Sequence, residues 1–319
     1  MINKLEKSKA ANFKLEVPIL FLVFNRLDTT ILVFSAIKKI QPSKLYIASD
    51  GPRESRPEET KAVNDVREFL LSNIDWDCEI LTLFNVSNLG CKKSVSNAIN
   101  WFFDQEEMGI VLEDDCLPSQ SFFQYCQELL YKYEHDQRIF LITGYNKQNE
   151  WKVTENDYFF SNLGGIWGWA SWRRAWEHYD VNLSDIDYFI SQDGFQKSLG
   201  NYLGDLKQHM IYNSVIRDNV DTWAMQWGYA RHKNNALTCI PSVSLIKNIG
   251  FGENATHTFG DNLDGVVDHE IIFPLRENRF IVSDESYDEL LFLRPNFLSR
   301  IRNKLKKFLI MIKLKKNQS

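Results

Sequence analysis

The sequence has few cysteines, and none of them form a C-x-x-C pair. The 319 residues contain five, an odd number, at scattered positions. This usage argues against a disulfide framework and against a cysteine zinc site. No stretch is dominated by proline, glycine or serine, no segment repeats at a fixed period, and 44% of residues are apolar. These features exclude disordered and solenoid classes and predict a globular chain with a sizeable core.

Long hydrophobic runs are also missing near the N-terminus. The first apolar stretch, residues 17–24, ends at Asn25-Arg26. A membrane-spanning helix needs about 20 apolar residues, and a secretory leader needs small residues at a cleavage site, which this segment lacks. We therefore expect a cytoplasmic protein.

Two nucleotide-binding motifs are absent. No G-x-G-x-x-G follows the first apolar stretch, and no Walker-type Gly-Lys-Ser/Thr occurs. Their absence argues against a dinucleotide site and a P-loop. A phosphate-bearing ligand must be held in another way.

The charge is negative and unevenly distributed. The net charge is −5, yet nine basic and no acidic residues follow Leu290, so residues 1–289 carry −14. An acidic body does not grip nucleic acid, and no nucleic-acid partner is expected. The basic tail suits an anionic surface.

Strand-like and helix-like segments alternate in the first part of the chain. Short runs rich in branched residues are followed each time by turn residues and then by helical spacing. The predicted strands are residues 17–24, 44–49, 78–84 and 109–112, and the predicted helices include 58–72 and 92–104. This order predicts an α/β fold with a mostly parallel twisted sheet flanked by helices, and ligands outside the carboxyl ends of the strands.

The second part is less regular. We expect a helix at 121–133, a strand at 138–146, a helical region at 183–217 and a strand at 236–246. The predicted organisation is an N-terminal extension (1–16), a catalytic domain (17–289, with a donor half to about 118 and an acceptor half beyond it) and a basic tail (290–319).

Three adjacent carboxylates, Glu113-Asp114-Asp115, follow the apolar residues 110–112. Like charges this close repel one another unless a cation lies among them. Hard oxygen ligands suit Mg²⁺ or Mn²⁺, which would neutralise a departing nucleoside diphosphate. The alternative is a solvated acidic turn, but the position at a strand end favours a metal site.

The order of the strings FLVFNR, IASDG, IVLEDDCLPSQSFFQY, ITGYN, LGGIWGWASW, DTWAMQW and GENATHT resembles the GT-A fold glycosyltransferases. It is most similar to the N-acetylglucosaminyltransferase I type, whose metal motif is Glu-Asp-Asp. The resemblance implies an inverting, metal-dependent transfer of a GlcNAc-like sugar from a UDP-sugar to a glycan or lipid-linked acceptor. The alternatives are a nucleotidyltransferase of related topology and a non-catalytic peripheral membrane or glycan-binding protein.

The same resemblance implies roles for single residues. Asp115 matches the direct metal ligand, and Glu113 and Asp114 match neighbours that contact the donor or the metal waters. Arg26 matches the arginine that meets the diphosphate, as a guanidinium can. Asp50 matches the acid that reads uracil. A surface ion pair for Arg26 and a turn cap for Asp50 are the structural alternatives.

Asp221 matches the catalytic base, since an inverting transfer needs one carboxylate near the acceptor hydroxyl. Asp218 is the second choice, and the structural alternative for Asp221 is the N-cap of the helical run 224–233. His257 resembles a histidine that approaches the metal or the diphosphate. A structural histidine is the alternative there.

The stretch at 162–180 is rich in glycine and tryptophan. Gly164, Gly165 and Trp167 are expected to line the donor or acceptor pocket, because glycine allows close approach and indole faces suit sugar rings. Trp172 and Trp176 are expected in the core, and their spacing with Trp169 suggests one buried helix face.

Residues 298–316 alternate apolar and basic positions with helical spacing. This pattern is typical of a helix lying in an anionic membrane surface, so we expect peripheral attachment to the inner face of the membrane. Docking of the tail on the acidic body is the alternative.

Overall fold

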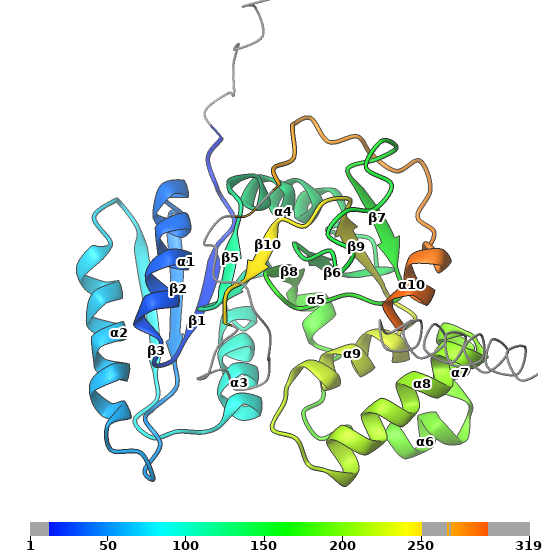
Figure 1. Cartoon of the computed structure of the whole chain (residues 1–319), viewed down its shortest axis with the longest axis horizontal. Helices are drawn as coiled ribbons and strands as arrows, with labels where there is room; N and C mark the ends of the chain where they lie inside the picture. The colour runs from blue at the N-terminus through cyan, green and yellow to red at the C-terminus, as the bar shows by residue number, and fades with distance from the viewer. Residues whose placement is uncertain (1–12, 251–266, 268, 293–319) are drawn as a thin grey trace, which may run out of the picture.

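One eight-stranded sheet runs through the protein, with helices on both faces (Figure 1). The computed structural model describes residues 13–250, 267 and 269–292. The strand order is β3-β2-β1-β4-β8-β6-β9-β7, and four of the seven neighbouring pairs are parallel. The predicted α/β class with a mostly parallel sheet is confirmed.

The first four strands form a parallel unit, as the alternating pattern predicts. They are linked by helices that return the chain to the same edge of the sheet. The strands are β1 (Ile19–Val23), β2 (Lys44–Ser49), β3 (Glu79–Phe84) and β4 (Met108–Glu113), and the helices are α1 (Leu27–Ile40), α2 (Glu59–Asn73) and α3 (Cys91–Phe103). Each predicted strand overlaps an observed one.

The second part of the chain extends the same sheet in mixed orientation. Its strands are β6 (Ile139–Thr143), β7 (Tyr158–Ser161), β8 (Trp169–Trp172) and β9 (Leu237–Pro241). β8 lies antiparallel between β4 and β6. β5 (Cys116–Pro118) follows the acidic triplet and pairs with β10 (Ile246–Asn248) in a separate two-stranded sheet, and α4 (Gln120–Lys132) comes after β5.

The remaining helices lie below and beside the second half of the sheet (Figure 1). They are α5 (Arg173–Trp176), α6 (Ile186–Ser191), α7 (Gly194–Leu199), α8 (Asn201–Ile211), the π-helix η1 (Tyr212–Arg217), α9 (Ala224–Lys233) and α10 (Glu285–Phe292). The predicted helical region 183–217 is thus several helices, broken at Gly200 by its left-handed φ of 77°. Among the described residues, no helix combines the length and apolar character needed to cross a membrane.

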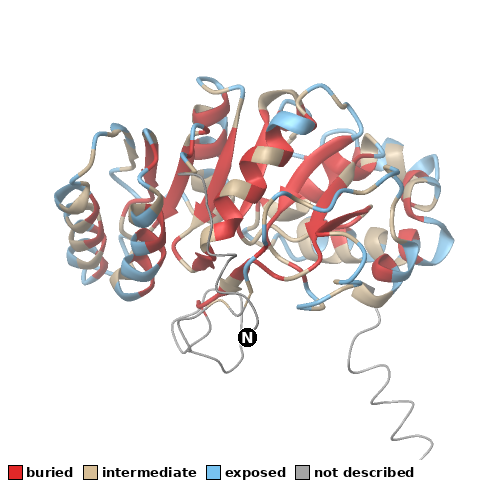
Figure 2. Cartoon of the chain, turned by 90° about the horizontal axis from the view of Figure 1, so that it is seen from above, coloured by how far each residue is buried: buried red, intermediate tan, exposed pale blue. Residues whose placement is uncertain are grey.

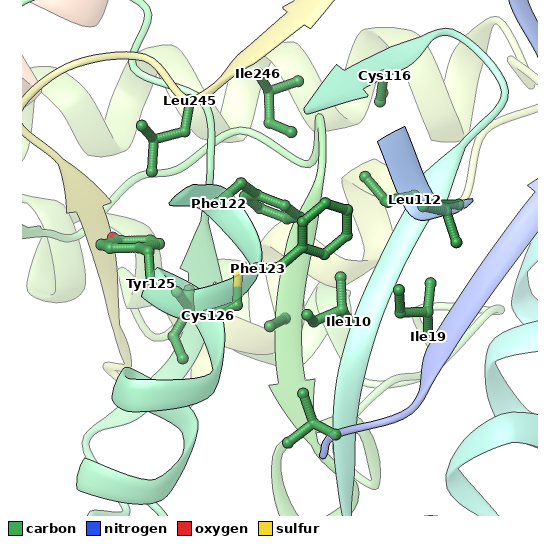
Figure 3. Close-up of a cluster of buried hydrophobic side chains, with 14 of the residues drawn as sticks. Ile19, Ile110, Leu112, Cys116, Phe122, Phe123, Tyr125, Cys126, Leu245 and Ile246 are labelled. Carbon is green, nitrogen blue, oxygen red and sulfur yellow. The ribbon is translucent and has the colours of Figure 1, made fainter. Parts of the chain in front are cut away.

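The core has one cluster on each face of the sheet, and Figure 2 shows the sheet as a buried layer between partly exposed helices. Alternate residues of β1 point to opposite faces, so Phe21 packs with α1, α2 and α4, whereas Leu22 packs with α3 and α9. In Figure 3, Phe122 and Phe123 of α4 fill the space beside Ile110 of β4.

The tryptophans of the Gly/Trp-rich stretch are buried, but they do not share a helix face. Trp169 and Trp172 lie in β8, where a spacing of three puts them on opposite faces of the sheet. Trp169 joins Trp176 in one cluster and Trp172 joins the other. The core assignment of Trp172 and Trp176 is therefore right, and the single helix face is wrong.

Candidate active site

A cleft of about 880 Å³ opens at the carboxyl ends of β1, β2 and β4. This is the edge at which parallel α/β sheets bind ligands, and the volume lies in the range of about 300 to 1,000 Å³ that small-molecule sites occupy. Four segments far apart in sequence bring five predicted site residues to its wall: Arg26, Asp50, Glu113, Asp114 and Asp221.

Arg26 is bonded to the acidic triplet. Its Nη2 donates to Asp114 Oδ1 at 2.5 Å and to Asp115 Oδ2 at 3.1 Å. The Phe24 N–H donates to the other oxygen of Asp114 at 3.2 Å, and Asp114 is 4% exposed. The pair is hydrogen-bonded and partly buried, with Arg26 half-buried and Asp114 buried, which differs from a surface ion pair. It fixes the β1–α1 turn against the end of β4.

One guanidinium does not balance three carboxylates. Burial, followed by the charges of Asp115 and Asp114, raises the pKa of Glu113 to about 8. Burial also raises the pKa of Asp114, and Arg26 only partly opposes this. Burial lowers the pKa of Arg26, but Asp114 and Asp115 outweigh it, so that pKa lies above its ordinary value. The site therefore has excess negative potential that a bound cation would relieve.

The donor set suits a hard cation, although the arrangement is not a ready-made cage. In the described part of the chain, no three His, Cys, Asp or Glu side chains are grouped to hold a metal ion. Glu113 lines the cleft, whereas Asp115 is not among its lining residues and faces Arg26 and Gly250. Carboxylates at a strand end, with net negative charge left over, fit Mg²⁺ or Mn²⁺, which keep several water ligands. Asp115 as the direct ligand stays a prediction.

Asp50 is saturated with hydrogen bonds from the loop before α3. Its two oxygens accept from the backbone N–H groups of Gly51 (2.9 Å), Leu89 (3.0 Å) and Gly90 (3.2 Å) and from Asn85 Nδ2 (3.1 Å). A carboxylate offers about four lone-pair sites. This geometry favours a structural role in shaping the cleft wall, and the reading of uracil by Asp50 stays a prediction.

Asp221 caps a helix far away in sequence. Its Oδ2 accepts from the Cys91 N–H at 2.7 Å and its Oδ1 from the Lys92 N–H at 2.9 Å, at the start of α3. A carboxylate there satisfies free N–H groups and interacts favourably with the helix dipole. A Cβ on Gly90 would lie 2.7 Å from Asp221 Oδ2, so glycine makes this approach possible. The expected cap of the helical run 224–233 is wrong, because α9 has no side-chain cap and Asp221 caps α3 instead.

Sequence reasoning missed two arginines of this cleft. Arg53 and Arg56 lie in the loop after β2 and line the cleft. Glu59, a buried residue of α2, holds Arg53 through Oε1 and Oε2, each 2.9 Å from the Arg53 Nε. The sequence contained a signal for these arginines, because basic residues closely follow the end of a predicted strand. Both arginines pair with Glu59, so their charge is partly neutralised, but guanidinium groups on the cleft wall add phosphate-binding capacity.

Gly164, Gly165 and Trp167 lie in the β7–β8 loop and are not among the residues that line this cleft. Trp167 packs on Tyr145, with ring centroids 4.4 Å apart, and a Cβ on Gly165 would meet the same tyrosine ring at 2.8 Å. A Cβ on Gly164 would meet Thr238 at 2.7 Å. Tight packing thus explains both glycines, and the donor-pocket role stays a prediction.

His257 and residues 298–316 lie outside the described residues. Gly250, seven positions before His257, lies against the acidic triplet, and the Ile249 N–H donates to the Asp115 backbone oxygen at 2.8 Å. A side chain at position 250 would collide with the Asp115 carboxylate. Asp218, the second choice for the base, is exposed and bonded to Arg217 and does not line the cleft.

No protein-family model matches this chain, and no curated protein matches it. Solved structures do. HddC from Yersinia pseudotuberculosis is 8% identical, with a TM-score of 0.31 over 51% of this chain and 80% of that chain. 4-Diphosphocytidyl-2C-methyl-D-erythritol synthase from Anaerococcus prevotii is 10% identical, with a TM-score of 0.32 over 55% and 84%.

UDP-glucose pyrophosphorylase complexed with UDP-glucose is 11% identical, with a TM-score of 0.30 over 51% of this chain and 78% of that chain. With TM-scores below 0.5, these likenesses carry no argument about activity or substrate. The α/β fold rests on the sheet and helices described above.

Proposed function

We propose that this chain is an enzyme that binds a nucleotide-sugar and a divalent cation in the cleft, and that it is a glycosyltransferase. The observation that carries the proposal is the meeting of Arg26 with the carboxylates of Glu113, Asp114 and Asp115 at the carboxyl ends of β1 and β4. A nucleoside diphosphate needs cationic and metal contacts, and this wall supplies both kinds.

Under this proposal the diphosphate lies between Arg26 and the loop that carries Arg53 and Arg56. Guanidinium groups bind phosphate oxygens in bidentate fashion, and those on the loop come from a different segment than Arg26. Asp115 and Glu113 would hold the cation, which supplies charge neutralisation to the leaving diphosphate. GlcNAc from UDP-GlcNAc is the donor that the family resemblance favours.

Asp221 is the proposed base. It lines the cleft, is exposed, and accepts one backbone N–H on each oxygen, which leaves further lone-pair sites free. It would take the proton of the acceptor hydroxyl while that oxygen bonds to the anomeric carbon and the nucleoside diphosphate departs. A single displacement of this kind inverts the anomeric configuration. The acceptor we propose is a glycan or lipid-linked precursor, bound by the acceptor half at about 119–289.

Nucleotidyl transfer is the second candidate. Arg53 and Arg56 supply two further guanidinium groups to the cleft wall, and guanidinium groups bind phosphate oxygens. Against it, β1 is joined to α1 by only residues 24–26, which leaves no room for a glycine-rich loop around a triphosphate.

Product analysis separates the two. Wild-type protein with Mn²⁺ and a panel of nucleotide-sugars is expected to release nucleoside diphosphate, slowly to water and faster with an acceptor. A nucleotidyltransferase instead consumes a nucleoside triphosphate and a sugar 1-phosphate and releases pyrophosphate. If neither product forms above the level of Asp115→Ala protein, the chain is not a nucleotide-sugar enzyme.

A further inference from the structure

A second pocket, of about 420 Å³, lies at the edge strand β7. It forms between residues 151–156, which precede β7, and residues 278–286, which run along that strand and lead into α10. The Asp284 N–H donates to the Phe160 backbone oxygen at 2.7 Å, so the Phe160 carbonyl is already used. The described residues that line this pocket and those that line the cleft are entirely different sets. The pocket is therefore separate from the cleft, and its volume suits a small ligand.

A fixed aromatic ring forms part of the pocket wall. Trp151 is half-buried, and its ring packs edge-on against Tyr287 with centroids 5.5 Å apart. Tyr287 packs in turn on Phe159 at 4.7 Å. The Trp151 Nε1 donates to Asp284 Oδ2 at 2.9 Å. These contacts hold the indole in one orientation, so a ligand that packs on it need not order it first.

Two carboxylates of the pocket are free to bind a ligand. Glu155 and Glu285 are exposed, and within the residues that the structure describes neither side chain forms a hydrogen bond or an ion pair. Asp284 differs, because it also accepts from Lys152 Nζ at 2.7 Å. Three carboxylates and one ammonium group leave the lining with a net charge of −2. This charge disfavours a phosphate or a carboxylate ligand.

A cationic ligand is disfavoured for another reason. Lys152 Nζ lies 5.6 Å from the centroid of the Trp151 ring, so a cation already interacts with this ring and would repel a second one. A neutral ligand with many hydroxyl groups fits better. Carboxylates accept hydrogen bonds from hydroxyl groups, and the side-chain amides of Asn156 and Asn278 also line the pocket and are able to donate and to accept. Indole faces suit the apolar faces of sugar rings.

We propose that this pocket binds an uncharged sugar unit of a glycan. The sugar ring packs on Trp151, and its hydroxyl groups donate to Glu155 and Glu285. The lining lies within residues 151–286, inside the proposed acceptor half, so the use of the site rests on the proposed function: it would hold part of the acceptor away from the reacting end. Binding itself needs neither nucleotide nor metal.

Fluorine NMR of the full chain, labelled with fluorotryptophan, tests the proposal. The Trp151 resonance is identified by its loss in Trp151→Phe protein. Methyl glycosides of glucose, galactose, mannose and N-acetylglucosamine are titrated one at a time, without nucleotide or metal. We expect at least one of them to shift the Trp151 resonance in a saturable way. Glu155→Ala and Glu285→Ala should each weaken this binding about ten-fold, because a hydrogen bond to a charged acceptor is lost.

Two control variants locate the sugar. Glu289→Ala removes an exposed carboxylate one turn further along α10, outside the pocket lining, and should leave the dissociation constant unchanged. Asp115→Ala alters the acidic triplet and should also leave it unchanged. Thermal melting of each variant checks folding. Glucosamine and glucuronate carry a positive and a negative charge on the same kind of ring, and both should bind no more tightly than the methyl glucoside.

Four results would overturn the proposal. They are the absence of any saturable shift of Trp151, wild-type affinity in Glu155→Ala or Glu285→Ala, loss of binding in Asp115→Ala, and at least ten-fold tighter binding of glucosamine than of the methyl glucoside, which would indicate a cation site. Sugar binding at this pocket without any nucleotide-sugar turnover would support the pocket and refute the activity proposed for the cleft, so the two proposals can fail separately.

Discussion

Replacing Glu113 by glutamine should stabilise the ligand-free protein in a pH-dependent way. The folded-state pKa of Glu113 is raised from 4.5 to about 8 by burial and by its two acidic neighbours. The folded protein thus holds this proton more tightly than the unfolded chain does. The proton on Glu113 therefore stabilises folded wild-type protein fully below pH 4.5. This stabilisation is lost as pH rises through 8, because the buried carboxyl then ionises. Glutamine keeps the shape but has no proton to lose, so it stays neutral as pH rises.

The size of the effect follows from the shift. Each pKa unit is worth about 1.4 kcal/mol, which sets an upper limit of about 5 kcal/mol. Three carboxylates and Arg26 share the titration, and the side chain is partly solvated, so we expect roughly 2 kcal/mol at pH 8.5. For a chain of 319 residues that is an increase in Tm of about 3 °C.

Thermal melts of wild type and Glu113→Gln, from pH 5 to pH 8.5 without divalent cations, measure this difference directly. Taking the difference between the two proteins cancels the titration of the groups that do not interact with Glu113. Glu68→Gln changes an exposed glutamate of α2 and should give a difference that does not vary with pH. A Glu113→Gln difference that is equally flat, or that falls as pH rises, would refute the account of repelling carboxylates.

Four further outcomes are expected. Asp115→Ala should abolish Mn²⁺-dependent UDP binding in calorimetry and leave the melting temperature near that of wild type; unchanged affinity would end the metal-ligand assignment. Asp221→Asn should keep donor binding and lower turnover about 10²-fold or more. Asp221→Ala should in addition cost about 1 kcal/mol of stability, because the α3 cap is lost. Equal losses of binding and rate in the asparagine variant would indicate a purely structural residue. Asp50→Ala should destabilise the protein by about 2 kcal/mol or more, since four donors lose their acceptor, and a neutral result in chemical denaturation would contradict the loop-holding role. Deleting residues 298–319 should release the protein from anionic vesicles without loss of activity on a soluble acceptor; retained sedimentation with vesicles together with a large drop in melting temperature would favour docking on the body.

The parallel half of the fold was predictable because its signals are local. The runs 45–48 and 109–112 are continuous and free of charged residues, and each is followed by turn or acidic residues. Strand ends in a parallel sheet meet at one edge, so Arg26, Asp50 and Glu113 could be placed together before any coordinates. The cleft confirms that grouping.

The second half was less predictable because its strands are short and their partners are distant. β8 has four residues, and its tryptophans at a spacing of three fit helix and strand equally well. The segment is a strand because it pairs with β4 and β6, and no pattern within the segment itself predicts that pairing. The cap that Asp221 gives to α3 was equally unpredictable, since it joins residues 130 positions apart.

The most direct test of the central claim is the binding of UDP to wild-type protein with and without Mn²⁺, measured by calorimetry at pH 7.5. Glycosyl transfer and nucleotidyl transfer both need a cleft in which carboxylates and arginines hold a nucleotide through a cation. We predict binding in the presence of Mn²⁺ that weakens at least about ten-fold when the metal is chelated. The same affinity with and without metal, or no binding under either condition, would contradict it.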